Sequence, residues 1–148
     1  MKESDVTKKN YRVYIERRRL LGNILGNDGV ILVPGAKTIK RNANTEYPFR
    51  QESGFLYLTG FNEPNALLVV AGGKNPCSVL FCDPRDEEDE FWTGKRFGPE
   101  SARREFGFHH AFANNDKMTM AQELAHSFRN RGVLYYPLHR EQNGLFGK

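Results

Sequence analysis

Four short apolar runs most constrain how this chain can fold. They cover residues 30–33, 67–70, 79–82 and 133–136, and Gly, Pro or Asn residues lie close to the ends of each run. All four are predicted as strands, and the all-apolar run 30–33 is typical of a strand that is covered on both faces. The turn-rich sequence at 72–76 predicts that the second and third strands form an antiparallel hairpin. A fifth short strand is expected over 108–112.

Three segments have helical patterns. Residues 10–25 carry one stripe at helical spacing, which includes Arg18, and end in a Gly-Asn-Asp-Gly sequence. Residues 98–106 begin with Pro at the first helical position and end at Gly107, and a third helix is expected at about 117–130. The order of elements predicts an α/β fold, a single domain with a mixed β-sheet of about five strands flanked by helices. The 148 residues suffice for one domain, whose core we expect at about 10–136.

Residues 36–65 are the least regular part of the sequence and the richest in aromatic side chains. Pro and Gly residues interrupt the stretch, so long regular elements are not expected there. Gly60 is expected to adopt a turn conformation that other residues avoid. Four aromatic residues are predicted to cover one face of the sheet as core side chains: Phe49, Phe55, Tyr57 and Phe61.

The two cysteines, Cys77 and Cys82, fall in one predicted strand. Their odd separation places the side chains on opposite faces, about 16 Å apart, so they cannot form a disulfide with each other. Two buried, reduced thiols and the absence of a secretory signal predict a cytoplasmic protein. The longest apolar run is far shorter than a membrane span, so no membrane partner is expected.

The net charge of +4 is a mild excess, which arises mainly in the first fifty residues. A basic helix there can attract nucleic acid, but aromatic residues are not interleaved with the basic ones as a single-strand platform requires. We therefore interpret it as a solvated helix face and expect no nucleic-acid partner.

The sequence contains no recognisable catalytic motif. A nucleophile elbow, a phosphate-binding loop and a zinc-protease helix are all absent. His109 and His110 are adjacent, so in a strand they point to opposite faces and cannot chelate one ion together. The acidic run 86–90 is expected to be a solvated loop or helix start, because five consecutive acids fan outward into water rather than converge on a metal. Neither a catalytic residue nor a metal ligand is assigned.

Two stretches resemble a known family. The first is Y-P-F-R-Q-E-S-G-F-L-Y-L-T-G-F-N-E-P at 47–64, and the second is E-F-W-T-G-K-R-F-G-P at 90–99. With the R-R-R-L sequence at 17–20, they resemble the N-terminal domain of Xaa-Pro aminopeptidases (aminopeptidase P), over roughly residues 10–136. The resemblance implies a ribonuclease H-like fold of the creatinase/prolidase N-terminal type.

Two residues are candidates for a substrate-cleft or interface site. Trp92 lies in a polar sequence with little local core to join, and large exposed aromatic residues are often contact residues. The resemblance implies that this loop approaches the substrate cleft of a neighbouring subunit. Asn44 occupies a loop position at which the family often carries Asp, so the charge expected there is lost. Lys95 and Arg96 are expected to pair with the acidic run 86–90.

The resemblance also implies what the whole protein does. Members of the family are two-metal hydrolases, usually manganese-dependent, that remove the residue before a penultimate proline. The two manganese ions are held by a separate C-terminal pita-bread domain, expected to follow residue 148, so this chain alone is expected to hold no cofactor and to be inactive. Its expected partners are its own catalytic domain, other subunits of a homo-oligomer and, for the parent enzyme, proline-containing peptides. The alternative is a free-standing binding or scaffold module that has lost the hydrolase.

Overall fold

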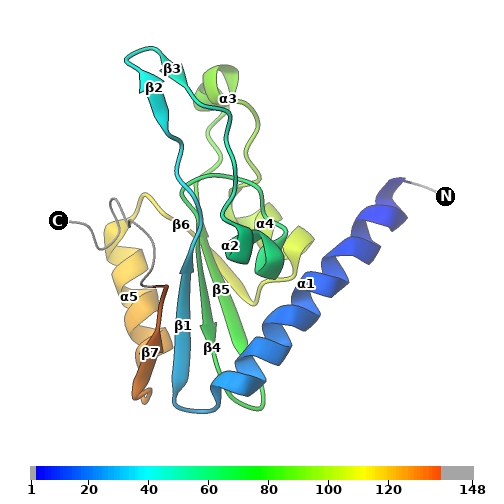
Figure 1. The fold of residues 1–148 in the computed structure, drawn as a ribbon, viewed down its shortest axis with the longest axis vertical. Helices are drawn as coiled ribbons and strands as arrows, with labels where there is room; N and C mark the ends of the chain where they lie inside the picture. Colours follow the sequence, from blue (N-terminus) through cyan, green and yellow to red (C-terminus); the bar gives the residue numbers. More distant parts are fainter. Residues whose placement is uncertain (1–2, 138–148) are drawn as a thin grey trace.

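The chain forms one mixed β-sheet with helices on both faces (Figure 1). The computed structural model describes the backbone of residues 3–137, and the side chains of residues 11–137 except 89, 92 and 93. The sheet has the strand order β6-β5-β4-β1-β7. Its strands are β1 (Gly29–Pro34), β4 (Leu67–Ala71), β5 (Cys77–Cys82), β6 (His110–Ala113) and β7 (Val133–Tyr135).

The strand directions explain the mixed character of the sheet. β4 is antiparallel to both of its neighbours, β1 and β5, whereas β5 with β6 and β1 with β7 form parallel pairs. The hairpin predicted between the second and third apolar runs is confirmed, with Val69 opposite Val79. Because β1, β5, β6 and β7 run in the same direction, the residues that follow β1, β5 and β6 come to the same end of the sheet.

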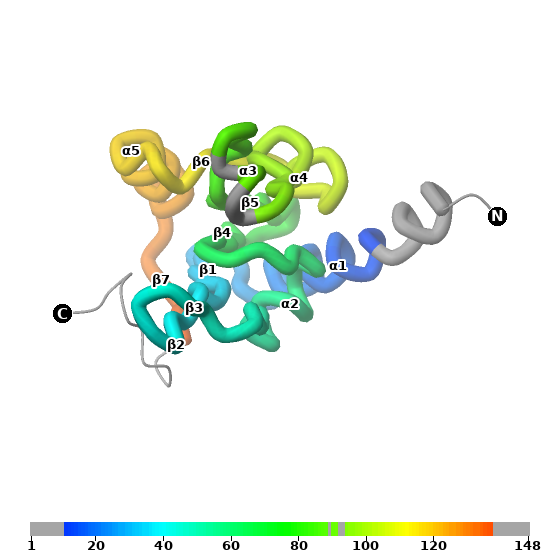
Figure 2. Tube along the Cα trace, turned by 90° about the horizontal axis from the view of Figure 1, so that it is seen from above, coloured from blue at the N-terminus to red at the C-terminus, as the bar shows by residue number. Residues whose placement is uncertain are grey.

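Helices cover both faces of the sheet, as Figure 2 shows in a view along the strands. Three helices lie on one face, and they are α1 (Glu3–Leu25), α2 (Ser53–Thr59) and α4 (Gly98–Phe106). The other face is covered by α5 (Lys117–Phe128). Both predicted C-terminal helices are confirmed, and Gly107 ends α4 in the left-handed conformation with φ 72°.

Helix α1 is held to the rest of the domain by a buried arginine on its predicted stripe. Arg18 is 3% exposed. Its guanidinium donates to the carbonyl oxygens of Leu58 (2.9 Å), Phe106 (2.6 Å) and Gly107 (3.3 Å), and it lies over the Phe108 ring. These bonds join α1 to the ends of α2 and α4, so one side chain fixes three elements that are distant in sequence.

The core consists of two layers, one on each face of the sheet. The layer beneath α1, α2 and α4 includes Phe55, Phe61 and Phe106, and the Phe61 and Phe106 rings meet edge to face with centroids 5.2 Å apart. The layer beneath α5 includes Val69 and Phe81. Alternate residues of β4 and β5 enter opposite layers, which is why these strands read as continuous apolar runs.

The cysteine prediction agrees with the strand geometry. Both thiols are free, with Cys82 in the layer beneath α1 and Cys77 packed against the layer beneath α5. Cys82 is fully buried, but Cys77 is only partly buried because it begins β5 at the end of the sheet. Burial raises the pKa of Cys82 to about 12 and raises that of Cys77.

The aromatic prediction for residues 36–65 is confirmed in part. Phe55 and Phe61 are completely buried, and Gly60 has φ 68°. The prediction is wrong for Tyr57, which is 57% exposed and lies beneath the Arg17 guanidinium at 4.0 Å. The reason is that this residue belongs to the short helix α2, whose period places Phe55 inside and Tyr57 outside. Phe49 is only half-buried.

Candidate functional site

The candidate site is a polar cleft at the end of the sheet where β5 and β6 finish. Asp83 directly follows β5, and Asn114 directly follows β6. Above them project the hairpin of β2 (Lys40–Asn42) with β3 (Thr45–Glu46), and the short helix α3 (Glu87–Thr93), as Figure 1 shows at the top of the molecule. The cleft between these elements has a volume of about 960 Å³.

A network of amide and carboxylate groups joins the ends of the strands. The side-chain amide of Asn114 donates to Asp83 Oδ1 (2.8 Å) and to the carbonyl oxygen of Asn65 (2.9 Å). The Asn65 amide donates to Asp83 Oδ2 (3.3 Å), and Asn65 has a φ of 65°, which Asn tolerates better than most residues. Asp83 therefore holds the segment before β4 beside the ends of β5 and β6.

Arg96 supplies positive charge to this network. Its Nε lies 3.8 Å from Asp83 Oδ2. The pairing that the sequence predicted, of Lys95 and Arg96 with the acidic run 86–90, is not among the ion pairs of the described residues. Glu90 instead pairs with Arg85 at 2.9 Å. Arg96 lies near Asp83 instead because the chain turns back after α3 and brings Arg96 over the end of β5.

The acidic run 86–90 is a helix start, as one of the two sequence interpretations stated. Asp86 caps α3, and its side chain accepts a hydrogen bond from the backbone N–H of Glu88 at 2.9 Å. Acidic side chains in a first turn are favoured by the partial positive charge of the helix N-terminus. The run therefore contributes the carboxylates of Asp86 and Glu90 to the cleft.

Glu63 lies behind the cleft and fixes the segment that follows α3. This carboxylate is 7% exposed. Its Oε2 accepts the backbone N–H of Phe97 (3.0 Å), whereas its Oε1 has no hydrogen-bond partner among the described residues. Burial raises the pKa of Glu63, although the Phe97 N–H and the charge of Arg96 act in the opposite direction.

The two residues singled out from the sequence belong to segments at this same end of the molecule. Asn44 lies exposed in the turn between β2 and β3 and lines the cleft, and its backbone N–H donates to Asn42 Oδ1 at 3.0 Å. Trp92 belongs to α3, but its side chain lies outside the described residues. The hairpin and α3 flank one cleft, although 48 positions separate the two residues in the sequence.

Sequence reasoning missed three residues of the cleft floor: Asn65, Asp83 and Asn114. The available signal was their position, because Asp83 and Asn114 are polar residues directly after predicted strands. That signal needed the parallel pairing of β5 and β6, which no local pattern reveals.

The described residues contain no group of three His, Cys, Asp or Glu side chains that could hold a metal ion. His109 and His110 point to opposite sides of the sheet, as predicted. His109 contacts Ser78 on the side of α1, and His110 stacks on Phe112 with centroids 6.3 Å apart. No helix in the described part of the chain is long and apolar enough to cross a membrane. Fold and cleft together define an α/β domain whose described residues offer a polar recess but no metal centre.

Comparison with known proteins identifies the family. The sequence model for the aminopeptidase P N-terminal domain matches residues 14–135, and the chain belongs to this family. The Xaa-Pro aminopeptidase of Escherichia coli is 33% identical over 135 residues, which cover 90% of this chain. The Xaa-Pro aminopeptidase of Haemophilus influenzae is 34% identical over 121 residues, or 81% of this chain.

Solved structures agree with the sequence comparisons. The structure of aminopeptidase P from E. coli with the inhibitor Pro-Leu superposes with a TM-score of 0.81 at 32% identity, over 89% of this chain. The mixed sheet flanked by helices is therefore the fold of that enzyme's N-terminal domain. The chain spans 29% of the length of the E. coli relative and 27% of the H. influenzae relative.

Proposed function

We propose that this domain forms one wall of the substrate entrance of a manganese-dependent Xaa-Pro aminopeptidase. The observation that carries the proposal is the polar cleft between the β2–β3 hairpin and α3, in a domain that matches 29% of the length of the E. coli enzyme. In this proposal the two metal ions and the hydrolytic chemistry belong to a separate catalytic domain, because this chain spans only 29% of the length of the E. coli relative. This domain would contribute binding surface for proline-containing peptides.

The chemistry of the cleft suits contact with a peptide. Asp86 and Glu90 supply carboxylates and Asn44 supplies an amide, while Arg96 and Lys40 supply cationic groups. Such groups can accept from the ammonium and N–H groups of a peptide and can donate to its carbonyl oxygens. A wall distant from the reacting bond binds substrate and transition state about equally, so its loss raises KM more than it lowers kcat.

We also propose that the same end of the domain contacts other subunits of a homo-oligomer. Phe91, on α3, is 82% exposed, and Phe97 is 38% exposed. Large exposed aromatic side chains of this kind are typical of interface residues. Sedimentation should show concentration-dependent association that Phe91→Ser weakens and that Met118→Ser, on α5, leaves unchanged. A strict monomer at high micromolar concentration would contradict this part of the proposal.

A chimera tests the entrance proposal. This chain would replace the matching N-terminal part of the E. coli Xaa-Pro aminopeptidase, and hydrolysis of an Xaa-Pro peptide would be measured. We expect Asn44→Ala and Trp92→Ala to raise KM severalfold with a smaller change in kcat, while Gln122→Ala, on the far face of α5, leaves both unchanged. Unchanged kinetics for both cleft variants would refute the entrance role.

The isolated chain gives a second test. We expect it to hydrolyse no Xaa-Pro peptide, with or without manganese, and turnover that follows its own elution peak would contradict the proposal. The alternative function, a binding or scaffold module without a hydrolase, would be favoured if the chimera folds but is inactive for every variant. A cytoplasmic, reducing location belongs to the same proposal and is supported by the two unbonded cysteines.

A further inference from the structure

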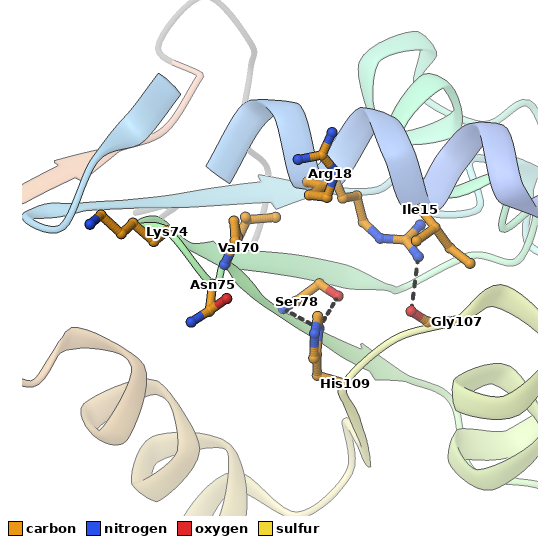
Figure 3. A pocket seen from close by; sticks show the side chains of 10 residues that line it. Ile15, Arg18, Val70, Lys74, Asn75, Ser78, Gly107 and His109 are labelled. Atoms are coloured by element: carbon orange, nitrogen blue, oxygen red, sulfur yellow. Dashed lines mark hydrogen bonds between the residues drawn. The ribbon is translucent and has the colours of Figure 1, made fainter. Parts of the chain in front are cut away.

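A second recess, called here the α1 pocket, lies at the opposite end of β5 and β6 from the cleft (Figure 3). It is enclosed by α1, by the turn between β4 and β5, and by the segment that enters β6. Its polar lining comes from Arg18, Arg19, Lys74, Asn75, Ser78 and His109, and its volume is about 260 Å³. The two recesses are separated by the length of the strands, so nothing assigned to the cleft accounts for this pocket.

The charges that line the α1 pocket have one sign. No Asp or Glu belongs to its lining, while three cationic side chains do. Arg19 is neutralised by Glu16, which it contacts with two hydrogen bonds. Arg18 and Lys74 form no ion pair with the described residues. Two positive charges therefore line one recess without a counter-charge, and such recesses concentrate anions.

Of these two cations, Arg18 is the more informative because it is almost completely buried, with an exposed fraction of 3%. Its three hydrogen bonds all end on neutral carbonyl oxygens. A guanidinium has five N–H groups, so two have no acceptor among the described residues. Burial without a counter-charge lowers the pKa of Arg18 to about 10, so the group stays charged at neutral pH. Lys74 stands at the rim, where its flexible stem lets the ammonium turn inward.

His109 and Ser78 complete the polar lining. The backbone N–H of Ser78 donates to His109 Nδ1 at 3.0 Å, so the neutral imidazole carries its proton on Nε2. The Ser78 hydroxyl lies 3.0 Å from the same Nδ1. Burial, the neighbouring His110 and the positive charge of Arg18 together lower the pKa of His109. Burial is the largest of these effects, and the charge of Arg18 adds to it.

We propose that the α1 pocket binds a phosphate group. Two uncompensated cations match the charge of a phosphate dianion, and the His109 Nε2–H is a neutral donor suited to its oxygens. The volume admits a phosphate group together with water molecules. A bound phosphate would supply the counter-charge that Arg18 lacks and would link α1 to the β4–β5 turn. The site is independent of the proposed substrate entrance.

The test follows His109 by NMR in the 148-residue chain while inorganic phosphate replaces chloride at constant ionic strength. We expect saturable shifts of the His109 ring signals and a higher pKa of His109 in phosphate, because an anion favours the imidazolium. Lys74→Gln should weaken phosphate binding about fivefold, as expected for one partly screened charge near 4 Å. The matched control Lys37→Gln removes the same charge from an exposed position outside the pocket lining and should weaken it less than about twofold by general screening.

Glycerol phosphate separates the two sources of the ligand. Binding as tight as that of inorganic phosphate assigns a phosphate monoester, and markedly weaker binding assigns the free ion; both support the phosphate site. The proposal is overturned if the His109 signals do not respond, if Lys74→Gln and Lys37→Gln have equal effects, or if acetate binds as tightly as phosphate. None of these readouts depends on Arg18 variants, which can fail to fold.

Discussion

Gln51→Ala should be among the most destabilising substitutions of a polar residue in this domain. Gln51 is 6% exposed, and its side-chain amide makes four hydrogen bonds to backbone groups. Its Oε1 accepts from the N–H of Ala36 (2.8 Å) and of Glu52 (3.0 Å), and its Nε2 donates to the carbonyl oxygens of Phe61 (3.0 Å) and Glu63 (2.9 Å). All four positions of the amide are therefore occupied.

The magnitude follows from those four bonds. At about 1 kcal/mol each they contribute about 4 kcal/mol, and truncation leaves buried backbone groups without partners. With an m-value of about 2 kcal/mol per M in urea, the unfolding midpoint should fall by about 2 M. Gln122→Ala is the matched control, because Gln122 is exposed on α5 and should change the free energy of unfolding by less than about 0.5 kcal/mol.

Gln51→Glu sharpens the test because it keeps the shape of the side chain. The new carboxylate would place an oxygen against the carbonyl oxygens of Phe61 and Glu63, where only a donor fits. The folded state therefore favours the protonated acid, so the folded pKa lies above the unfolded value of about 4.3. Stability of this variant is then greatest at acid pH and is lost as pH rises through the folded pKa. A fall of less than about 0.5 M for Gln51→Ala, or a Gln51→Glu variant with the wild-type pH dependence, would refute the reasoning.

Three further predictions concern buried side chains and are tested by denaturation or by thiol labelling. Phe55→Ala should cost about 3–5 kcal/mol in urea, because the side chain is fully buried, whereas the exposed Leu56→Ala should cost less than about 1 kcal/mol. Burial raises the pKa of Glu63, so the protonated side chain contributes stability that is fully present below about pH 4 and is lost as pH rises through the folded pKa; the thermal unfolding midpoint of Glu63→Gln should therefore rise relative to that of the wild type between pH 4 and 7, and a constant difference would contradict this. A thiol reagent should label the half-buried Cys77 long before Cys82, and equal rates would show that β5 is not packed as described.

The sheet could be predicted from sequence because its signals are local. Three of the four apolar runs lie in the largely buried strands β1, β4 and β5, since a strand covered on both faces needs apolar side chains at every position. The fourth run, 133–136, overlaps β7 (Val133–Tyr135), an edge strand whose side chains are exposed in the described structure. The ends of α4 could also be predicted, because Pro99 favours the first turn of a helix and Gly107 adopts the left-handed conformation that ends one. The first helix was placed at 10–25 and begins at Glu3, because the polar sequence before residue 10 has no apolar stripe to reveal a helix.

The site was less predictable because its contacts join distant parts of the chain. Asp83 and Asn114 are separated by 31 positions and meet only because β5 and β6 are parallel neighbours. The exposure of Tyr57 could be predicted only by recognising a helix of seven residues in a sequence rich in Gly and Pro. Arg96 was assigned to the nearest acids in sequence, whereas its ion pair depends on how the chain returns after α3.

The family motif and the cleft have different roles in this domain, and Gln51 shows why. The segment between β1 and β4 leaves the sheet at Ala36 and returns to it near Glu63, and the Gln51 amide binds backbone groups at both places. The segment is thus closed at its base, so the β2–β3 hairpin can project without support from a core of its own. Glu63 in turn fixes the segment that follows α3, on the other side of the cleft, because its side chain accepts the Phe97 N–H. Residues that fix the cleft can therefore belong to the motif at 47–64 without lining the cleft, as Gln51 and Glu63 do, while the exposed Asn44 at the hairpin tip lines it and can change at little cost in stability.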